Sequence, residues 1–173
     1  DELVTDSYFE DQASRANFLG LMLTPMVRPL IGRAPLHLIT GPDAGSGKST
    51  LAECMLGITY TGKPLESAQF PEKPEERAKW LLSQALDGVT LLHLDNLGDV
   101  LDSSNLASLL TSARISDRIL GGNSIARLDN LMTVVGTGNN TNTSREIARR
   151  TVIVRLVPPM PNPEDRPASS YTH

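Results

Sequence analysis

The sequence has a single cysteine, and it has no long apolar run. Cys54 stands alone among 173 residues, so an intramolecular disulfide is excluded. Its place between Glu53 and Met55 in a predicted helix favours a buried structural thiol, which fits a reducing compartment. No stretch approaches the roughly 20 consecutive apolar residues that span a bilayer. We therefore expect a soluble, cytoplasmic protein without a membrane partner.

The sequence also lacks an excess of basic charge. The formal net charge is −4 and the pI is near 5.3. This balance argues against a surface coated with basic side chains for nucleic acid. A nucleic-acid contact must therefore be local, or be made by a partner or by a region outside this sequence. Internal repeats are absent too, so a repeat architecture is not expected.

Length and composition favour one globular domain with flanking segments. We expect residues 1–33 to form a helical segment that packs on an ATPase-like core of residues 34–157. Residues 158–173 are expected to form an extended, Pro-rich tail. Because the sequence begins without Met and ends in that loose run, both ends look cut from a longer protein.

Strand and helix patterns alternate along the middle of the chain. Apolar residues at helical spacing, interrupted by Pro25 and Pro29, predict one or two short helices within 18–31 that cover an edge of the sheet. A turn at Gly121, Gly122 and Asn123 predicts a hairpin. Further strands are predicted at 36–40, 89–94, 132–137 and 151–156, and further helices at 51–58, 74–87, 103–112 and 143–149. This alternation predicts an α/β fold of three layers, with a mostly parallel central sheet flanked by helices.

A glycine-rich loop joins the first strand to the next helix. Backbone N–H groups and a helix N-terminus face an anion at such a junction. Lys48 would reach the β and γ phosphates of a nucleotide, and the Ser49 hydroxyl would ligate Mg²⁺. Five residues separate Gly41 from Gly47 where the usual pattern has four, so either the loop has one extra residue before Gly45 or the cradle begins after Gly41. The candidate nucleotide-binding residues are Gly41, Pro42, Asp43, Ala44, Gly45, Ser46, Gly47, Lys48, Ser49 and Thr50.

Polar residues follow two further predicted strands. Asp95 is the only acid placed at a strand end to hold Mg²⁺ with Ser49, although a capping or turn aspartate is the alternative. Asn96 follows it where a water-activating Glu is often found, and an amide cannot serve as a general base. Asn139, with Asn140 as its neighbour at the cofactor, could orient the attacking water. A plain Asn-rich turn is the alternative.

Two arginines end the helix that precedes the last strand. Arg149 and Arg150 are either a solvated surface pair or the source of an arginine finger, which would reach the γ-phosphate on a neighbouring subunit.

Five segments, in this order, resemble the AAA+ P-loop ATPase core, and more narrowly the superfamily 3 helicases and the phage- or mobile-element-encoded replication ATPases. They are GPDAGSGKST, LLHLDN, LASLLTSARISDRILGG, VVGTGNN and ARRTVIVRL. The resemblance implies ATP and Mg²⁺ as cofactors, a homo-oligomeric ring that is expected to be a hexamer, and single-stranded DNA as a partner. It also implies a pore hairpin with Arg118, Asn123 and Arg127 as DNA-binding candidates. Because the charge of this segment is modest, a structural hairpin or a subunit contact is the alternative.

Three functions are compatible with these residues. The first is an ATP-hydrolysing motor domain of a ring-forming DNA helicase. The second is a non-hydrolysing nucleotide-binding switch or assembly scaffold, which Asn96 favours. The third is a small-molecule P-loop kinase, which shares Lys48, Ser49 and Asp95 but needs an arginine-bearing lid and an acceptor pocket that the sequence does not reveal.

Overall fold

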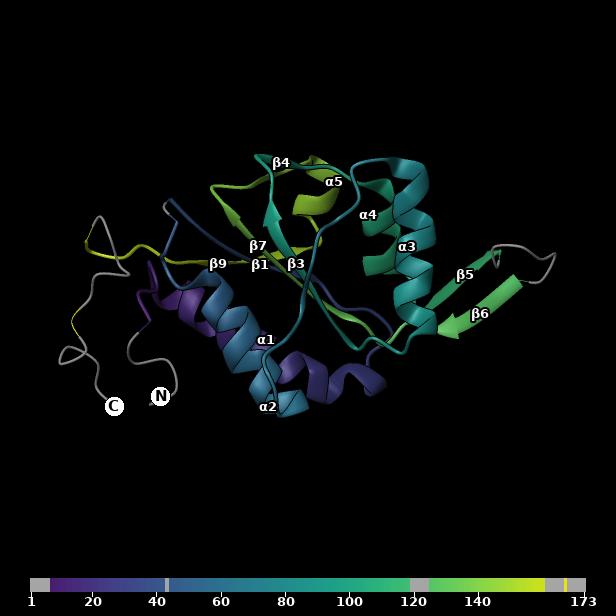
Figure 1. Ribbon diagram of the computed structural model, residues 1–173, viewed down its shortest axis with the longest axis horizontal. Helices are drawn as coiled ribbons and strands as arrows, with labels where there is room; N and C mark the ends of the chain where they lie inside the picture. The colour runs from purple at the N-terminus through teal and green to yellow at the C-terminus, as the bar shows by residue number, and fades with distance from the viewer. Residues whose placement is uncertain (1–6, 43, 119–124, 161–166, 168–173) are drawn as a thin grey trace.

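A five-stranded parallel sheet forms the centre of the molecule (Figure 1). The computed structural model describes residues 7–42, 44–118, 125–160 and 167. The strand order is β2-β3-β7-β1-β9, and every neighbouring pair is parallel. The strands are β1 (Leu36–Gly41), β2 (Ser67–Ala68), β3 (Leu91–Leu97), β7 (Thr133–Asn139) and β9 (Thr151–Arg155). The predicted α/β class with a mostly parallel sheet is confirmed.

The register of the sheet decides which residues meet at its two ends. β1 is the middle partner of β7 and β9, with Leu36 opposite Val134 and Thr151, and with Gly41 opposite Asn139. All six residues of β1 are buried, as expected for a strand covered on both faces. The carboxyl ends of β1, β3 and β7 therefore lie at one edge of the sheet, and the segments that precede these strands lie at the other.

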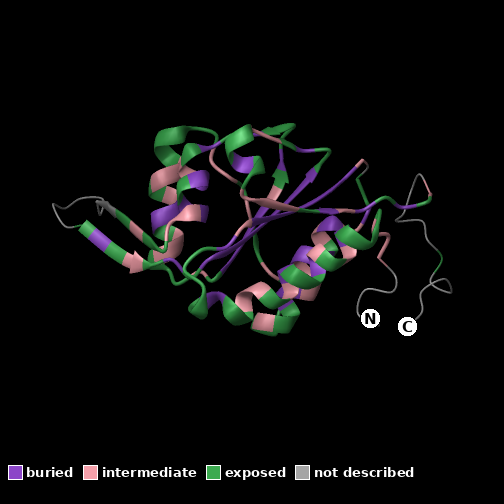
Figure 2. Ribbon diagram, turned by 180° about the vertical axis from the view of Figure 1, so that it is seen from behind, coloured by how far each residue is buried: buried purple, intermediate pink, exposed green. Residues whose placement is uncertain are grey.

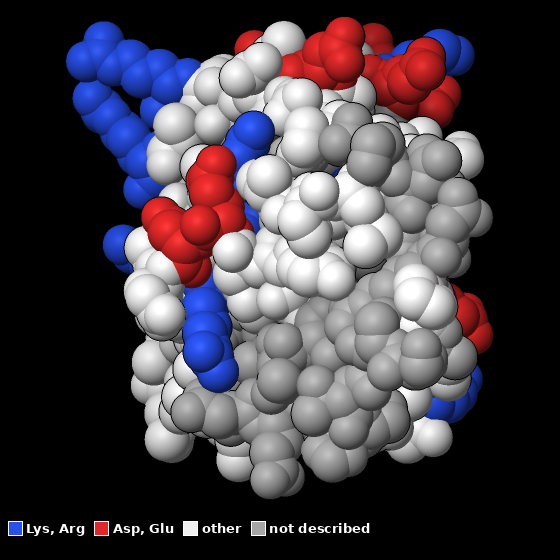
Figure 3. Space-filling model, turned by 90° about the vertical axis from the view of Figure 1, so that its left-hand side faces the viewer, with Lys and Arg blue, Asp and Glu red and all other residues white. Residues whose placement is uncertain are grey.

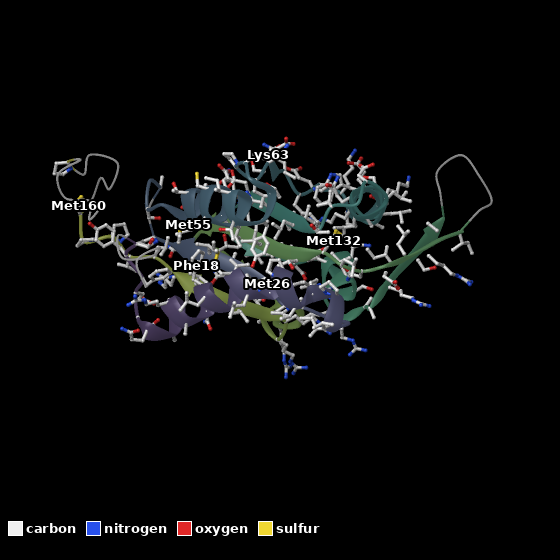
Figure 4. All side chains as sticks on the ribbon, turned by 90° about the horizontal axis from the view of Figure 1, so that it is seen from below. Phe18, Met26, Met55, Lys63, Met132 and Met160 are labelled. Carbon is white, nitrogen blue, oxygen red and sulfur yellow. The ribbon has the colours of Figure 1, made fainter. Side chains whose placement is uncertain are left out.

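Helices cover both faces of the sheet and complete a three-layer arrangement (Figure 1). Apolar clusters fill both interfaces, while the outward sides of the helices are exposed (Figure 2). Phe18 and Met55 belong to the cluster between the first group of helices and the sheet, and Figure 4 shows them from below. The first group is α1 (Gln12–Val27), the 3-10 turn η2 (Arg28–Leu30), the π-helical η3 (Thr50–Leu56) and α2 (Gly57–Thr61); the second is α3 (Pro74–Leu86), α4 (Ser104–Thr111) and α5 (Arg145–Ala148).

The N-terminal helix is longer than the sequence predicts. We expected prolines to interrupt it, yet α1 runs for 16 residues with Pro25 inside. Pro25 lacks the N–H that would bond to the Leu21 carbonyl, yet the helix continues for two residues beyond it, and Pro29 falls in the following turn η2. α1 packs on β9 and β1, and so covers an edge of the sheet as predicted.

The helix after the glycine loop differs from the predicted α-helix in its winding. Leu51, Met55 and Ile58 were expected on one buried face, but Ile58 is 55% exposed. Residues 50–56 are π-helical, and the wider turn rotates later side chains away from the face that a 3.6-residue period predicts. The buried pair is instead Leu51 and Leu56, five residues apart. Cys54 is half-buried, so its expected full burial is wrong.

A hairpin extends from the edge of the sheet opposite the carboxyl ends (Figure 1). Strands β5 (Arg114–Arg118) and β6 (Ile125–Asp129) pair in antiparallel fashion. Asn130 follows β6 directly, and β7 begins three residues later. The predicted hairpin is confirmed, although its first strand begins at Arg114, while the Gly-rich tip lies outside the described residues. Two short strands, β4 (Val100–Leu101) and β8 (Asn142–Thr143), form a separate parallel pair.

Gly57 allows the chain to return closely over the helix after the glycine loop. A Cβ atom at this position would collide with the backbone of Leu65 and would approach the carbonyl oxygen of Lys63 to 2.7 Å. We therefore expect Gly57→Ala to lower the free energy of unfolding by about 2 to 3 kcal/mol. Gly20→Ala is the matched control in α1, where an added Cβ meets nothing within 4 Å, and it should stabilise by about 0.5 to 1 kcal/mol. Urea unfolding measures both, and equal effects would contradict the close contact.

His37 makes the stability of the fold dependent on pH. Its Nε2 lies 3.2 Å from Thr24 Oγ1, its ring is 3% exposed, and burial lowers its pKa from 6.5 to about 4. Below pH 6.5 the unfolded chain binds a proton that the folded chain refuses until about pH 4. Stability is therefore lost as the pH falls through this window, by about 3 kcal/mol at pH 4. Urea unfolding of the wild type and of His37→Gln between pH 7 and pH 4 measures this slope; equal slopes would contradict it.

Candidate functional site

A cavity opens at the carboxyl ends of the strands, between the glycine loop and the ends of β3 and β7. Its volume is about 380 Å³. Sequence positions almost a hundred residues apart meet here, because β1, β7 and β3 are neighbours in the sheet. The cavity is lined by Ala44, Gly45, Ser46, Gly47, Lys48, Ser49, Thr50, Asp95, Asn96, Thr137, Gly138 and Asn139. The structure thus brings the loop together with the candidates Asp95 and Asn139.

The loop reaches the cavity in a conformation that requires glycine. Gly45 and Gly47 have φ values of 73° and 86°, a region that side chains disfavour. Lys48 is 8% exposed, and its Nζ donates to Ser46 Oγ at 2.7 Å. Lys48 therefore lies within the loop, and its amine contacts Ser46.

Gly41 packs within the sheet and does not line the cavity. It is the last residue of β1, and an added Cβ would collide with the carbonyl oxygen of Leu156. Its own carbonyl accepts a hydrogen bond from Asn140 N at 3.0 Å. Neither Gly41 nor Pro42 lines the cavity, which favours the interpretation that the cradle begins after Gly41. Asp43 lies outside the described residues.

Asp95 faces the loop from the end of β3. Ser49 Oγ donates to its Oδ1 at 3.3 Å, and Thr137 Oγ1 of β7 donates to the same oxygen at 2.5 Å. Asn96 follows with φ 50°, and the pairing of β3 with β7 shifts register between Leu94 and Leu97. Asp95 and Asn96 thus belong to a bulged strand end, where β-bulges commonly redirect side chains.

Two further side chains continue the network away from the cavity. His93 lies two residues before Asp95 on β3 and has no exposed side-chain surface. Its Nε2 lies 3.2 Å from Thr137 Oγ1, and its Nδ1 lies 3.7 Å from Glu53 Oε1 on η3. Burial lowers the pKa of His93, an effect that Asp95 opposes, while burial and the charge of Asp95 raise the pKa of Glu53. Both shifts favour the neutral forms of the pair.

Sequence reasoning missed Thr137, His93 and Glu53, although a periodic signal existed for each. Side chains two apart on a strand share a face, so His93 accompanies Asp95 and Thr137 accompanies Asn139. Glu53 follows Ser49 by four residues at the start of a helix, which places both on one side.

The oxygen ligands at the cavity suit a magnesium ion. Mg²⁺ prefers carboxylate, hydroxyl and water oxygens, and Ser49 and Asp95 supply the first two within 3.3 Å of each other. Ligand atoms of Glu53, His93 and Asp95 also lie within 4.8 Å of one another. A buried imidazole is a poor ligand for Mg²⁺, so the pair that fits this ion is Ser49 with Asp95.

The two asparagines occupy different positions at the end of β7. Asn139 is exposed and lines the cavity. Asn140, with φ 47°, turns away from it and accepts a hydrogen bond from Arg155 Nη2 at 3.2 Å. Arg155 also donates through Nε to Glu10 Oε1 at 3.2 Å. The structure therefore places Asn139 at the cavity, and it ties Asn140 to Arg155, a residue that sequence reasoning did not select.

Arg149 and Arg150 lie at the opposite end of the sheet from the cavity of the same chain. They directly precede Thr151, which pairs with the first residue of β1, whereas the loop follows its last residue. Arg150 Nη1 donates to Glu146 O at 2.5 Å, and the Arg150 carbonyl accepts from Leu36 N. Arg149 is exposed. The structure thus does not bring either arginine to the cavity within one chain.

The hairpin carries the DNA-binding candidates, also far from the cavity. Arg127 is exposed on β6. Arg118 is the last residue of β5, where its backbone pairs with that of Ile125. Asn123 lies outside the described residues. At the base of the hairpin, Arg114 Nε forms an ion pair with Asp129 at 3.1 Å, which reduces the free positive charge there.

The charge distribution agrees with the acidic composition. On the face shown in Figure 3, acidic side chains accompany the basic ones, and no continuous basic surface is visible. Of the helices in the described residues, none combines the length and the apolar character needed to cross a bilayer.

Comparison with known proteins does not assign the chain to a family. No protein-family model matches the sequence, and no curated protein matches it. The class that the structure defines is an α/β protein with a parallel five-stranded sheet and a cavity at the carboxyl ends of its strands.

Proposed function

We propose that this chain is the ATP-hydrolysing motor domain of a ring-forming DNA helicase or replication ATPase of phage or mobile-element type. The observation that carries the proposal is the meeting of the glycine loop, Asp95 and Asn139 at one cavity. In open α/β sheets, ligands bind outside the carboxyl ends of the strands, and a loop that leads into a helix N-terminus suits phosphate.

The cavity residues would share the work of hydrolysis. Backbone N–H groups of the loop and Lys48 would hold the β and γ phosphates of ATP. Ser49 and Asp95 would hold Mg²⁺, which supplies charge neutralisation at the phosphates when bound. Asn139 would orient a water molecule whose oxygen attacks the γ-phosphorus. The bond from the γ-phosphorus to the bridging oxygen then breaks, and ADP leaves with the bonding electrons. One proton of the water stays on the inorganic phosphate and the other is released to solvent.

A ring would complete the site with a group from a second copy of the chain. Among the described residues that line the cavity, Lys48 is the one with a cationic side chain. Arg149 is exposed at the other end of the sheet, where a head-to-tail neighbour could present it. The hairpin would then lie near the DNA in the pore, and the whole assembly would act in the cytoplasm.

The test is phosphate release from Mg-ATP by the purified chain as a function of protein concentration. We expect weak hydrolysis by dilute monomer, and a rise when the chain assembles with single-stranded DNA. Equal rates for monomer and assembly, with and without DNA, would contradict a ring-forming motor. Sedimentation at each concentration gives the oligomeric state.

A non-hydrolysing nucleotide-binding switch or assembly scaffold is the second candidate. It is favoured by Asn96, which stands beside Asp95 where an activating carboxylate is often found. The two candidates differ in product, because a switch binds radiolabelled ATP without releasing phosphate. Phosphate release by the wild type that disappears in Lys48→Ala would exclude the switch. A small-molecule kinase has less support, because it needs an arginine-bearing lid and the described residues that line the cavity include no arginine.

A further inference from the structure

Asp95 is held by a chain of side chains that leads away from the cavity. Thr137 Oγ1 donates to Asp95 Oδ1 at 2.5 Å, and His93 Nε2 lies 3.2 Å behind that hydroxyl. Glu53 Oε1 lies 3.7 Å from the far nitrogen of the same ring. These contacts connect β7 to β3 and then to η3, the helix that follows the glycine loop.

The protons in this chain fix the direction of its hydrogen bonds. A hydroxyl carries one hydrogen, and Thr137 uses it to donate the hydrogen bond to Asp95. The Thr137 oxygen can then only accept, so His93 Nε2 must be the donor at 3.2 Å. His93 Nδ1 is left facing Glu53, fully buried and with no hydrogen bond in the structure.

We propose that Thr137, His93 and Glu53 are positioning residues that hold the Asp95 carboxylate toward Ser49 and so raise the affinity of the site for a divalent cation. This inference rests on the proposed function, because it concerns the ion that accompanies the nucleotide. Residues that hydrogen-bond to a metal ligand fix its orientation, and their loss commonly weakens metal binding 10- to 100-fold. Glu53 does not line the cavity, although its carboxylate lies beside His93 and within 4.8 Å of the Asp95 carboxylate.

The site needs such support, because Asp95 lies on an irregular stretch of strand. The register of β3 against β7 shifts between Leu94 and Leu97, so regular backbone pairing does not fix this segment. Asp95 is also partly exposed, with 33% of its side-chain surface accessible. The Thr137 hydroxyl is a fixed point for it, because Thr137 is 1% exposed and lies within the regular part of β7.

Thr137→Val is the sharpest test, because it removes the hydroxyl and keeps the shape. Mn²⁺ is titrated against the protein with the ATP analogue adenylyl imidodiphosphate, and free Mn²⁺ is read by electron paramagnetic resonance. We expect at least about 10-fold weaker Mn²⁺ binding in Thr137→Val, and recovery in Thr137→Ser, which restores the hydroxyl. Thr133→Val is the matched control, since Thr133 is a buried threonine at the far end of the same strand, and its hydroxyl makes no hydrogen bond in the structure.

Glu53 has its own pair of variants. Glu53→Ala should weaken Mn²⁺ binding by a smaller factor than Thr137→Val, because Thr137 hydrogen-bonds directly to Asp95. Glu66→Ala is the control on an exposed glutamate whose side chain is 90% accessible. In nitrogen-15 spectra of histidine, Glu53→Ala should shift the resonance of His93 Nδ1, while Glu66→Ala should leave it unchanged.

The outcomes separate this inference from the proposed function. Equal Mn²⁺ affinity of Thr137→Val and the wild type, with the analogue bound by both, would overturn the positioning role and leave the proposed function standing. An unshifted His93 Nδ1 resonance in Glu53→Ala would remove Glu53 from the chain. A wild-type chain that binds neither Mn²⁺ nor the analogue would overturn the proposed function, and the inference with it.

Discussion

Replacing Lys48 with alanine is expected to abolish ATP hydrolysis, with a loss of about 10²- to 10³-fold or more in the rate. Lys48 is nearly buried at the start of the helix after the glycine loop, and of the cavity-lining residues that the structure describes it alone is cationic. Negative charge develops on the leaving phosphate in the transition state, and a positioned ammonium group stabilises it. The measurement is phosphate release from radiolabelled ATP at saturating Mg²⁺.

The control for Lys48→Ala must separate charge from folding. Lys48→Met keeps most of the side-chain volume without the charge, and should lose hydrolysis to the same extent while unfolding near the wild-type temperature. Lys63→Ala removes an exposed lysine whose partner is Glu66, and should leave hydrolysis unchanged. Hydrolysis retained in both Lys48 variants would contradict the assignment of the loop to phosphate.

Replacing Arg149 with alanine is expected to have a comparable or larger effect on the assembled protein, about 10³-fold, with nucleotide binding unchanged. Arg149 is exposed and cannot serve the cavity of its own chain, because it lies at the opposite end of β1 and β9. Any loss of hydrolysis must therefore act between subunits. Arg150 is held by Glu146 and by the start of β1, so we expect Arg150→Ala to act mainly on stability.

Mixing two inactive proteins tests action between subunits. Arg149→Ala supplies an intact cavity and Lys48→Ala supplies an intact Arg149, so mixed assemblies contain some complete sites. We expect partial recovery of hydrolysis at intermediate ratios. Arg145→Ala is the control, because Arg145 is another exposed arginine of α5. An absence of recovery at every ratio would count against an arginine finger supplied by a neighbour.

Much of the fold could be predicted from local patterns in the sequence. The continuous apolar run of β1 and the Ser103 cap of α4, which accepts from Leu106 N, are local features. They fix where elements begin and end without help from the rest of the chain. The meeting of Asp95 and Asn139 also followed from the sequence, because both come at the ends of parallel strands.

Other features depend on contacts that no local pattern reveals. The π-helical turn that exposes Ile58 and the bulge at Asn96 are set by packing and strand pairing. The bond from Thr137 to Asp95 requires β3 and β7 to be neighbours, although β4 to β6 lie between them in the chain. The position of Arg149, in contrast, was available from the sequence. A residue before a parallel strand must lie at the edge opposite to residues that follow one.

Strand β7 runs from the base of the hairpin to the cavity. Asn139 ends this strand at the cavity, and the hairpin strand β6 joins its other end through Asn130 and the two residues that follow. The Asn130 amide donates to the carbonyls of Leu109 and Ser112 and its oxygen accepts from Met132 N, so the junction is braced against bending. Asn130 therefore ties the start of β7 and the base of the hairpin to the end of α4. The seven residues of β7, about 23 Å in length, separate this junction from the cavity.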